Sequence, residues 1–578
     1  MIQNAKRIPD GETIACDYCI VGAGAAGISL ALELAKTNRS VVLLEAGGMN
    51  RAGRSLDLYR GTLADPERHL PLDKDRYRQL GGTTAIWGGR CIPFDPIDFE
   101  PRPYVPHSGW PFGASELEPF YRRAHEYCEC GAYAYRAAEA LPDAPREMIG
   151  GFHDGELVTD TIERWSPPTH FGKRYKAVMK SLTNLRVLVN AVCMELVTGA
   201  DGRRVAHVAV STFRRNTFRV SPRATILAGG GMEVTRLLLA SRRAHALGIG
   251  NHSDWLGRCY MCHLSGAIAR VQFPAGVPVI SGYEQDADGV YFRRRLWIDG
   301  AAQRRHGLLN THLMLDRPLI SDPSHGSGIL SLAFLAKNMV QGKRHLEPGR
   351  GKYALYWAHA RNILSGSPEI MSFLPKFCRR RFVQGRRIPS LLMQSKSNSY
   401  YLYYHSEQSP HRDSRLSVSS ERDAFGVPRL HLDYRMADGD VESVLHVHEL
   451  IDRELRKGGC GQLVFNEEDV RADIRRNQAV LGHHIGTTRM SVRPEDGVVD
   501  PDCRVHGGAW RGQPLCGEQF GVPYQQPSQP DIDHRGDGPA PRRSAESVTR
   551  PRLSRGDAAN YRQGLSQELG TADPENLL

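Results

Sequence analysis

The chain has little of what marks secreted, membrane-spanning or nucleic-acid-binding proteins. Its 578 residues include 12 cysteines, which are scattered and show no disulfide framework. No apolar run is long enough to cross a bilayer, and residues 1–7 lack the apolar core of a signal peptide. No segment resembles a nucleic-acid-binding module. These absences favour a cytoplasmic protein, and 40% hydrophobic with 24% charged residues is ordinary globular composition.

The sequence gives only a weak signal for a metal site. Cys16 with Cys19, and Cys259 with Cys262, have the C-x-x-C spacing of zinc and redox sites. The first pair lies in a predicted strand, and neither pair has a convincing second half. We therefore expect buried or incidental thiols and no metal site.

The net charge is +11, and basic residues are concentrated in two runs of the sequence. Such runs can attract an anionic surface, a membrane or an acidic substrate. A solvated face on an insertion is the commoner outcome, and we favour it over peripheral membrane contact. The basic residues are Lys343, Arg344, Arg350 and Lys352, followed by Lys376, Arg379, Arg380, Arg381, Arg386 and Arg387.

The start of the chain carries a dinucleotide-binding fingerprint. A short buried strand at 18–21 precedes G-x-G-x-x-G at 22–27, and apolar residues with helical spacing follow over 28–35. A second apolar strand over 41–44 ends in Glu45. Because strand, glycines, helix, strand and acid all occur in order, the pattern predicts a Rossmann-like unit.

Each residue of the fingerprint has a physical task. Gly22 permits the tight turn, Gly24 lets the backbone approach a pyrophosphate, and Gly27 lets helix and strand pack closely. The helix then directs free N–H groups at the phosphates. Glu45 can accept hydrogen bonds from a ribose and would repel a 2′-phosphate, which argues against NADP. FAD and NAD stay open at this point, although the absence of a second such unit fits a hydride acceptor that remains bound.

Six further segments follow in a characteristic order: E-A-G-G at 45–48, L-G-G-T-T-A-I-W-G-G at 80–89, and the segments 224–238, 256–258, 482–490 and 497–507. Together they resemble the glucose–methanol–choline (GMC) oxidoreductases, in particular the bacterial members, from Cys16 to His506. The resemblance implies a flavoprotein dehydrogenase or oxidase acting on the CH–OH group of an alcohol or sugar. It also implies an α/β plus α+β fold, in which a Rossmann-like FAD-binding domain is interleaved with a substrate domain built on an antiparallel sheet.

The resemblance also assigns residues to the cofactor. The glycine-rich stretch 81–89 has too little side chain for a core strand and suits a backbone lying against a flat ring. Ile86 stands where some relatives carry a histidine that attaches FAD, so we expect non-covalent FAD. Val192 resembles the adenine-contacting position. The expected cofactor contacts are Gly22, Gly24, Ala25, Ala26, Gly27, Glu45, Ala46, Gly81, Gly82, Thr83, Val192, Ala228, Gly229, Gly486 and Thr487.

His483 is the expected catalytic base. Alcohol oxidation needs a group that takes the hydroxyl proton while a hydride leaves carbon for flavin N5, and a neutral imidazole suits this task. In the His-x-x-Gly-Thr motif, His483 resembles the catalytic base of the family. Its neighbour His484 is the competing choice.

The middle of the chain reads as the substrate domain. Strands over 399–405 and 427–434 are expected to build a sheet facing the flavin, and a helix over 441–457 leads back. Tyrosines in the first strand either stack on a sugar ring or pack in the core, and we favour packing. The predicted division is 12–110 and 185–270 for FAD binding, 111–184 for a connecting or cap region, 271–479 for the substrate, 480–507 for the active-site segment, and 508–578 for an aberrant disordered tail.

The family pattern stops after Gly507. The family continues with a strand, a second catalytic Asn or His, and a closing helix, whereas this chain has a polar tail without helical or strand period. Codons for 513–542, read one nucleotide later, can encode a family-like C-terminus with an Asn-Pro-Thr segment. We therefore hypothesise a frameshift near 507–510. The rival interpretations are a catalytically inactive FAD-binding scaffold and an NAD-binding enzyme; the electron acceptor stays unknown.

Overall fold

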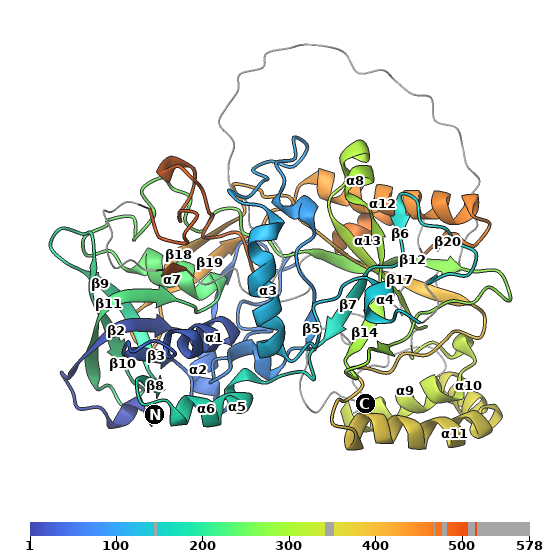
Figure 1. Cartoon of the computed structure of the whole chain (residues 1–578), viewed down its shortest axis with the longest axis horizontal. Helices are drawn as coiled ribbons and strands as arrows, with labels where there is room; N and C mark the ends of the chain where they lie inside the picture. The colour runs from blue at the N-terminus through green and yellow to red at the C-terminus, as the bar shows by residue number, and fades with distance from the viewer. Residues whose placement is uncertain are drawn as a thin grey trace, which may run out of the picture.

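The computed structural model describes residues 1–143, 147–318, 320–341, 352–466, 469–476, 483–506 and 515–516. Figure 1 shows two sheet-centred halves side by side, one around β2, β3 and β11 and the other around β12, β17 and β20. The chain passes between these halves several times, so each is built from segments distant in sequence. This confirms the mixed architecture of a parallel Rossmann-like sheet beside an antiparallel one.

The first half is an eight-stranded sheet whose main path runs β1-β8-β3-β2-β11-β10-β9. The five strands from β1 to β11 along this path pair in parallel, and β10 and β9 continue antiparallel. β3 is buried along its whole length, and its four apolar residues before Glu45 fit a parallel strand covered on both faces. The strands are β1 (Ile2–Asn4), β2 (Thr13–Val21), β3 (Val41–Glu45), β8 (Leu185–Val189), β9 (Val192–Thr198), β10 (Val205–Ser211) and β11 (Thr217–Leu227).

The predicted strand–glycine–helix unit is confirmed, with longer elements than the apolar pattern indicated. β2 begins five residues before the predicted start, and α1 (Ala25–Leu34) begins directly after Gly24. From the neighbouring strand, α7 (Gly231–Ala240) leaves the carboxyl end of β11 and buries most of its apolar side chains. The carboxyl ends of β2, β3 and β11 therefore meet at one edge, where ligands of open α/β sheets bind.

The second half centres on an antiparallel six-stranded sheet in the order β20-β12-β17-β16-β15-β6. Along β17, Tyr400 and Tyr404 pack with the apolar face of α12, while Tyr401 and Tyr403 pack on the opposite face. All four rings are buried, in line with the expected packing role. The elements are β6 (Leu157–Val158), β12 (Leu264–Gln272), β15 (Leu296–Ile298), β16 (Thr311–Asp316), β17 (Ser399–Ser406), α12 (Asp438–Lys457) and β20 (Gln462–Phe465).

The expectation that the two predicted strands build one sheet is wrong. β19 (Pro428–Asp433) pairs with β18 (Arg415–Arg422) and with β4 (Gly61–Leu63) in a separate three-stranded sheet. This sheet packs against the Rossmann-like half, where Arg236 of α7 donates to the carbonyl of Pro428. Alternation of side chains predicts a strand but carries no information about its partner, because pairing is decided by contacts distant in sequence.

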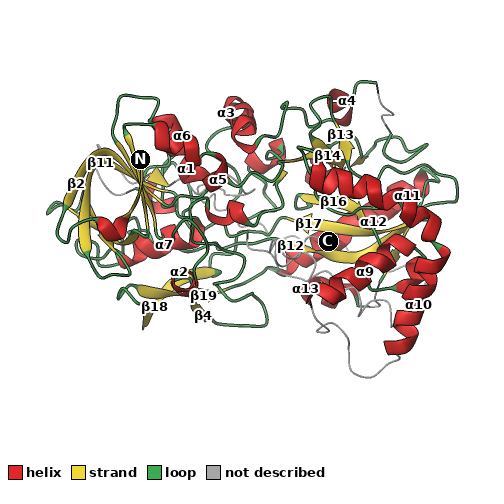
Figure 2. Ribbon diagram, turned by 90° about the horizontal axis from the view of Figure 1, so that it is seen from below, coloured by secondary structure: helices red, strands yellow, loops and turns green. Residues whose placement is uncertain are grey.

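Further elements surround these sheets, and helices α9, α10 and α11 form a group outside the second half (Figure 2). Among the described residues, no helix is long and apolar enough to cross a membrane. The elements are α2 (Gly53–Asp57), β5 (Arg90–Cys91), α3 (Ala114–Cys128), α4 (Ala137–Ala140), β7 (Ile162–Trp165), α5 (Phe171–Arg174), α6 (Lys176–Ser181), β13 (Glu284–Gln285), β14 (Tyr291–Arg294), α8 (Gly300–His306), α9 (Gly328–Gln341), α10 (Lys352–Ser365), α11 (Ser367–Cys378) and α13 (Val470–Arg476).

Two sequence expectations concern chain division. The predicted boundary between 270 and 271 falls inside β12, so the antiparallel sheet begins earlier than expected; the other boundaries stay predictions. The aberrant tail and the frameshift hypothesis lie outside the described residues, except for β21 (Leu515–Cys516). This pair lies parallel to the end of β11, so the expectation of no strand is wrong for these two residues.

Candidate active site

The glycine turn between β2 and α1 separates internal packing from ligand space. A Cβ on Gly22, whose φ is +106°, would lie 2.5 Å from the carbonyl oxygen of Ala228, and one on Gly27 would lie 1.9 Å from that of Gly22. A Cβ on Gly24 would meet nothing within 4 Å. Gly22 and Gly27 are therefore required by the protein's own packing, whereas Gly24 borders open space at the start of α1.

That open space has the chemistry of an anion site. Gly24 is the N-cap of α1 and makes no side-chain capping bond, so Ala25 and Ala26 begin the helix with N–H groups that no cap satisfies. The helix dipole adds partial positive charge at the same place. The residues present thus fit the pyrophosphate of a dinucleotide.

Glu45 lies at the end of β3 beside this turn. Its carboxylate accepts hydrogen bonds from the backbone N–H groups of Ala23 (3.2 Å) and Gly47 (2.7 Å). Burial raises the pKa of Glu45 to about 7, against the opposing effect of those two hydrogen bonds. The adjoining pocket is lined by residues that include Gly22, Glu45, Ala46, Val192 and Gly229. The structure therefore brings these five predicted contacts together, while Ala228 packs behind Gly22.

Sequence reasoning missed a charged wall of the same pocket. Tyr59, Arg78, Glu233 and Arg236 also line it. Arg78 pairs with Glu233 and lies over the ring of Tyr59, with its guanidinium carbon 4.2 Å from the ring centroid. Although burial opposes it, the charges of Arg78, Arg76 and Arg236 lower the pKa of Glu233 to about 2. No motif spacing linked Arg78 to Glu233, since 155 positions separate them.

The second glycine-rich stretch lies directly on the turn. Gly81 donates its N–H to the carbonyl of Ala23 at 2.8 Å, and a Cβ on Gly82 would lie 2.9 Å from the Cα of Gly24. Both have positive φ, +98° and +53°, which glycine adopts without steric cost. The exposed Thr83 follows in a single 3₁₀ turn. These contacts put the predicted flavin segment at the expected edge of the sheet.

His483 meets a group of imidazoles from the antiparallel sheet. Its Nδ1 lies 2.7 Å from Nε2 of His263, whose ring stacks on that of His405 with centroids 4.7 Å apart. His312 of β16 lies close enough that its charge would lower the pKa of His405. Sequence reasoning missed these three histidines. β17 is buried without interruption from Tyr400 to Tyr404, so no local pattern singled out His405 or linked it to His483.

The electrostatics keep these rings neutral. Withdrawal from bulk water, with a further contribution from the charge of Arg90, lowers the pKa of His483 to about 4, although part of its side chain is exposed. Burial holds the pKa values of His263, His312 and His405 well below the usual histidine value. Uncharged imidazoles at neutral pH can accept a proton or a hydrogen bond from a hydroxyl group.

His484 faces other partners. Its Nδ1 lies 2.6 Å from the hydroxyl of Tyr260, and both contact Cys262. Adjacent histidines thus serve different surroundings: His483 faces the imidazoles of the antiparallel sheet, and His484 faces a buried tyrosine and thiol. The assignment of the base to His483 stays a prediction that this division favours.

The residues after the histidines are fixed by backbone contacts. A Cβ on Gly486, whose φ is +100°, would lie 1.7 Å from the carbonyl oxygen of Cys259. Thr487 accepts a hydrogen bond from the hydroxyl of Thr235 at 2.8 Å and holds the N–H of Gly257 with its carbonyl. Gly486 and Thr487 therefore anchor the histidine segment to α7 and the 257–261 segment. Their contact with a flavin stays a prediction.

Comparison with known proteins finds relatives that align over most of the chain. Paromamine 6′-oxidase of Streptomyces fradiae is 23% identical over 538 residues, covering 85% of this chain and 84% of that protein. The fructose dehydrogenase large subunit of Gluconobacter japonicus is 22% identical over 569 residues, covering 86% and 92%. Among solved structures, pyridoxine 4-oxidase from Mesorbium loti aligns at 17% identity with a TM-score of 0.48, covering 87% of this chain and 93% of that one.

The class follows from the family models. Residues 17–300 match the model of FAD-dependent oxidoreductases, which covers the glycine turn, Glu45 and the second glycine-rich stretch. Residues 410–509 match the model of GMC oxidoreductases, which covers both histidines. The chain belongs to the GMC oxidoreductase family of FAD-dependent enzymes.

The glycine turn generates a prediction about FAD affinity. Gly24→Ala should weaken FAD binding by about ten-fold or more, because the methyl group enters the space of the pyrophosphate. The cofactor-free protein should keep its unfolding temperature, since Gly24 has an ordinary backbone conformation and open space around it. Flavin fluorescence titration and thermal unfolding measure the two quantities.

Gly439→Ala is the matched control, because its Cβ also meets nothing within 4 Å and it lies in α12. It should leave FAD affinity unchanged and should not lower the unfolding temperature, because alanine is favoured over glycine within a helix. Gly27→Ala should instead destabilise the cofactor-free protein, since its Cβ would overlap the carbonyl of Gly22. Unchanged FAD affinity in Gly24→Ala would show that the pyrophosphate lies elsewhere.

Proposed function

We propose that the protein oxidises the CH–OH group of a small alcohol or sugar, with non-covalently bound FAD and His483 as the base. The observation that carries the proposal is the position of His483. It belongs to a segment anchored to the FAD-binding half. Its Nδ1 nevertheless lies 2.7 Å from Nε2 of His263, next to the antiparallel sheet. A substrate held against that sheet would therefore present its hydroxyl group to His483.

The histidine pair suggests how the base is kept ready. A base needs a free lone pair on Nε2 of His483, so its Nδ1–H must donate to Nε2 of His263. His263 then fixes the ring orientation and stabilises the positive charge that forms when His483 takes the proton. Such an orienting partner is the general arrangement around catalytic histidines. His263 is thus a positioning residue.

The cofactor contacts divide among the residues already described. The N–H groups at the start of α1 would hold the pyrophosphate, Glu45 the ribose, and the backbone of Gly81 and Gly82 would lie near the ring. When bound, FAD supplies the oxidising power by accepting a hydride from the substrate carbon. Ile86 stands at the position where a histidine could attach the ring, so the chain offers no nucleophile there, and we propose non-covalent binding.

The walls around His483 suit a neutral polyhydroxylated substrate. His263, His312 and His405 are uncharged at neutral pH, and the nearby arginines are already paired, Arg90 with Glu163 and Arg295 with Asp95. Neutral imidazoles exchange hydrogen bonds with hydroxyl groups without demanding a charge on the substrate. The names of two relatives, a paromamine oxidase and a fructose dehydrogenase, are compatible with a sugar-like substrate.

The direct test is anaerobic reduction of the bound flavin. The purified chain should be yellow, and a panel of alcohols and sugars should bleach it; oxygen uptake and dye reduction then separate an oxidase from a dehydrogenase. The same measurements on a frame-restored chain test the proposal that a frameshift near 507–510 removed a second catalytic residue. A colourless chain in both forms would contradict FAD binding, and a yellow chain that no substrate bleaches would favour an inactive scaffold.

Replacing the base should lower turnover specifically. His483→Asn should reduce kcat by about 10²–10⁴-fold, the usual contribution of a positioned general base, with flavin content unchanged. His483 is partly exposed, so the substitution leaves no buried cavity. His446→Asn, an exposed histidine of α12, is the control and should keep full activity. A His483→Asn protein with normal kcat would assign the base elsewhere.

The lowered pKa of His483 predicts the acid limb of the pH profile. The base works only when neutral, so kcat/KM should fall as pH falls through its pKa. Because that pKa is lowered to about 4, activity should persist well below the usual histidine value of about 6.5. Stopped-flow flavin reduction from pH 4 to pH 8 measures the limb. An apparent pKa at or above the usual value would contradict the neutral surroundings described for this ring.

A further inference from the structure

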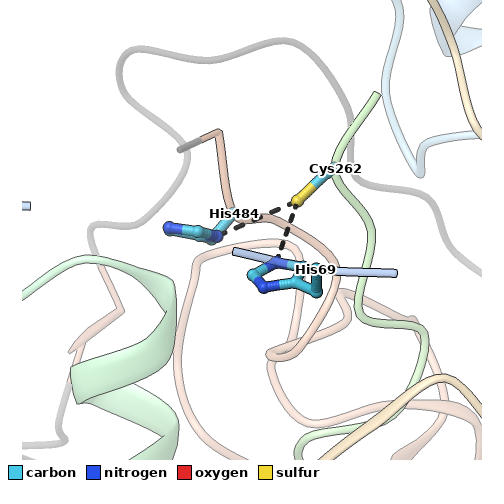
Figure 3. A group of neighbouring side chains, drawn as sticks. All are labelled: His69, Cys262 and His484. Carbon is cyan, nitrogen blue, oxygen red and sulfur yellow. Dashed lines mark hydrogen bonds between the residues drawn. The ribbon is translucent and has the colours of Figure 1, made fainter. Parts of the chain in front are cut away.

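A second cluster of potential ligands lies beside the catalytic histidine. His69, Cys262 and His484 direct one ligand atom each to a common point, and these atoms all lie within 4.8 Å of one another. Figure 3 shows both imidazoles and the sulfur converging from three separate segments. We propose that His69, Cys262 and His484, together with Tyr260, bind a structural zinc ion. This proposal departs from the sequence expectation of no metal site.

The spacing of the ligand atoms fits a tetrahedral ion. The sulfur of Cys262 lies 3.7 Å from Nε2 of His69 and 3.9 Å from Nδ1 of His484. Zinc bonds of about 2.3 Å to sulfur and about 2.0 Å to nitrogen, at tetrahedral angles, require nitrogen–sulfur separations of about 3.6 Å. The hydroxyl oxygen of Tyr260 lies 2.8 Å and 2.6 Å from the two nitrogens and 3.4 Å from the sulfur. The two oxygen–nitrogen distances are hydrogen-bond lengths, whereas a tetrahedral ion requires about 3.3 Å, so Tyr260 must shift by about half an ångström on ion binding to become the fourth ligand.

The surroundings hold His69 in the form that binds metal. Its Nδ1 lies 2.6 Å from the carbonyl oxygen of Leu70. A carbonyl only accepts, so Nδ1 carries the hydrogen and Nε2 directs a lone pair at the cluster. A ligand histidine that donates its other N–H to a backbone carbonyl is the usual outer-shell arrangement of zinc sites. Nitrogen and sulfur ligands favour zinc over magnesium or calcium.

Apolar and aromatic side chains surround most of the cluster, in which His69 and Cys262 are buried and His484 is half-buried. Tyr260 and Cys262 belong to a buried group with Leu416, Leu432 and Tyr434. The nearby Arg76 is paired with Glu233, a carboxylate that it shares with Arg78. Binding breaks the S–H bond of Cys262 and forms a Zn–S bond, with the proton released to solvent, and Tyr260 loses its proton in the same way. Thiolate and phenolate then neutralise the two charges of the ion.

The proposed ion would tie together three segments that surround the active site. His69 follows β4, Cys262 precedes β12, and His484 is the next residue in the chain after His483. Four protein ligands leave no open position, so the role is structural rather than chemical. His484 in zinc coordination would fix the backbone that carries His483.

Metal analysis of the full-length protein tests this proposal. After dialysis against metal-free buffer, mass spectrometry should find about one zinc per chain, and a chelator should lower the unfolding temperature. Cys262→Ser and His69→Asn should lose the zinc, while Cys16→Ser, another buried thiol, should keep it. Flavin content measured on the same samples separates this result from the proposed oxidation.

The contrary outcomes are distinct. Absence of stoichiometric zinc both after purification and after incubation with zinc chloride would overturn the site, as would copper or iron in its place. If Cys262→Ser fails to fold, the zinc content of the unmodified chain and its response to the chelator still decide.

A different observation carries a second proposal. Of the 14 large apolar side chains that are exposed in the described part of the chain, eight lie between 339 and 383. Tyr353 (93% exposed), Trp357 (71%) and Leu364 (72%) occupy one face of α10, since their spacing returns to the same side of a helix. Met371 and Leu374 add an exposed apolar pair on α11.

Positive charge lies on the same part of the chain, which we call the insertion and which comprises α9, α10, α11 and the residues up to 387. Residues 352–387 contain eight lysines and arginines against one acidic residue, Glu369. Exposed aromatic and aliphatic side chains beside a basic cluster are typical of helices that lie in the surface of an anionic bilayer. We infer that α10 and α11 dock on such a membrane surface. The sequence alone favoured a solvated face, because it did not reveal that the apolar side chains are exposed.

Sedimentation with lipid vesicles tests the docking surface. The protein should sediment with vesicles of phosphatidylcholine and phosphatidylglycerol, less with pure phosphatidylcholine, and less at high salt. The double variant Tyr353→Ser, Trp357→Ser should bind about ten-fold more weakly. Leu247→Ser, which changes an exposed side chain outside the insertion, is the control.

Two results would overturn the inference. The first is that the double variant and the unmodified protein sediment equally with the vesicles, or that neither of them sediments. The second is a dimer in solution that the double variant abolishes, because a second copy of the chain would then cover this face.

Discussion

The close contact between the turn after β2 and the turn after β11 is the constraint on which the cofactor site depends. Gly22 lies against the Ala228 carbonyl, and Gly27 lies against Gly22, so neither position leaves room for a side chain. This contact brings α1 down onto the sheet with its first N–H groups at the sheet edge. Once that edge is set, Glu45 and Val192 line a single pocket, and the Gly81–Gly82 loop lies against the glycine turn.

The second organising feature is the segment that carries the adjacent histidines. Ile485 exchanges backbone hydrogen bonds with Met261, and Gly486 packs on Cys259, so the segment is held by the chain that leads into β12. This anchoring turns His483 toward the imidazoles of the antiparallel sheet and His484 toward Tyr260 and Cys262. One short stretch thereby links the Rossmann-like half, the half with the antiparallel sheet and the proposed zinc site.

Helices α9, α10 and α11 lie together outside the second half (Figure 1). Its apolar residues on α10 are only partly used within the protein, where Leu355 and Tyr356 pack with Phe334. The opposite face carries the exposed aromatic side chains. Exposed apolar side chains of this size favour association with another surface, so their position on α10 points to a docking role.

The sequence by itself determined the local parts of this protein. The glycine fingerprint, the two flanking strands, α12 and the position of the histidine motif could all be predicted, because each depends on neighbours close in sequence. Strand pairing could not be predicted: β17 and β19 can each be recognised as a strand from their own residues, yet they belong to different sheets. The same limit explains why His263, His405, Arg78 and the cluster around Tyr260 were missed. Their meeting depends on contacts between segments hundreds of residues apart, and only the tertiary structure decides which of those segments become neighbours.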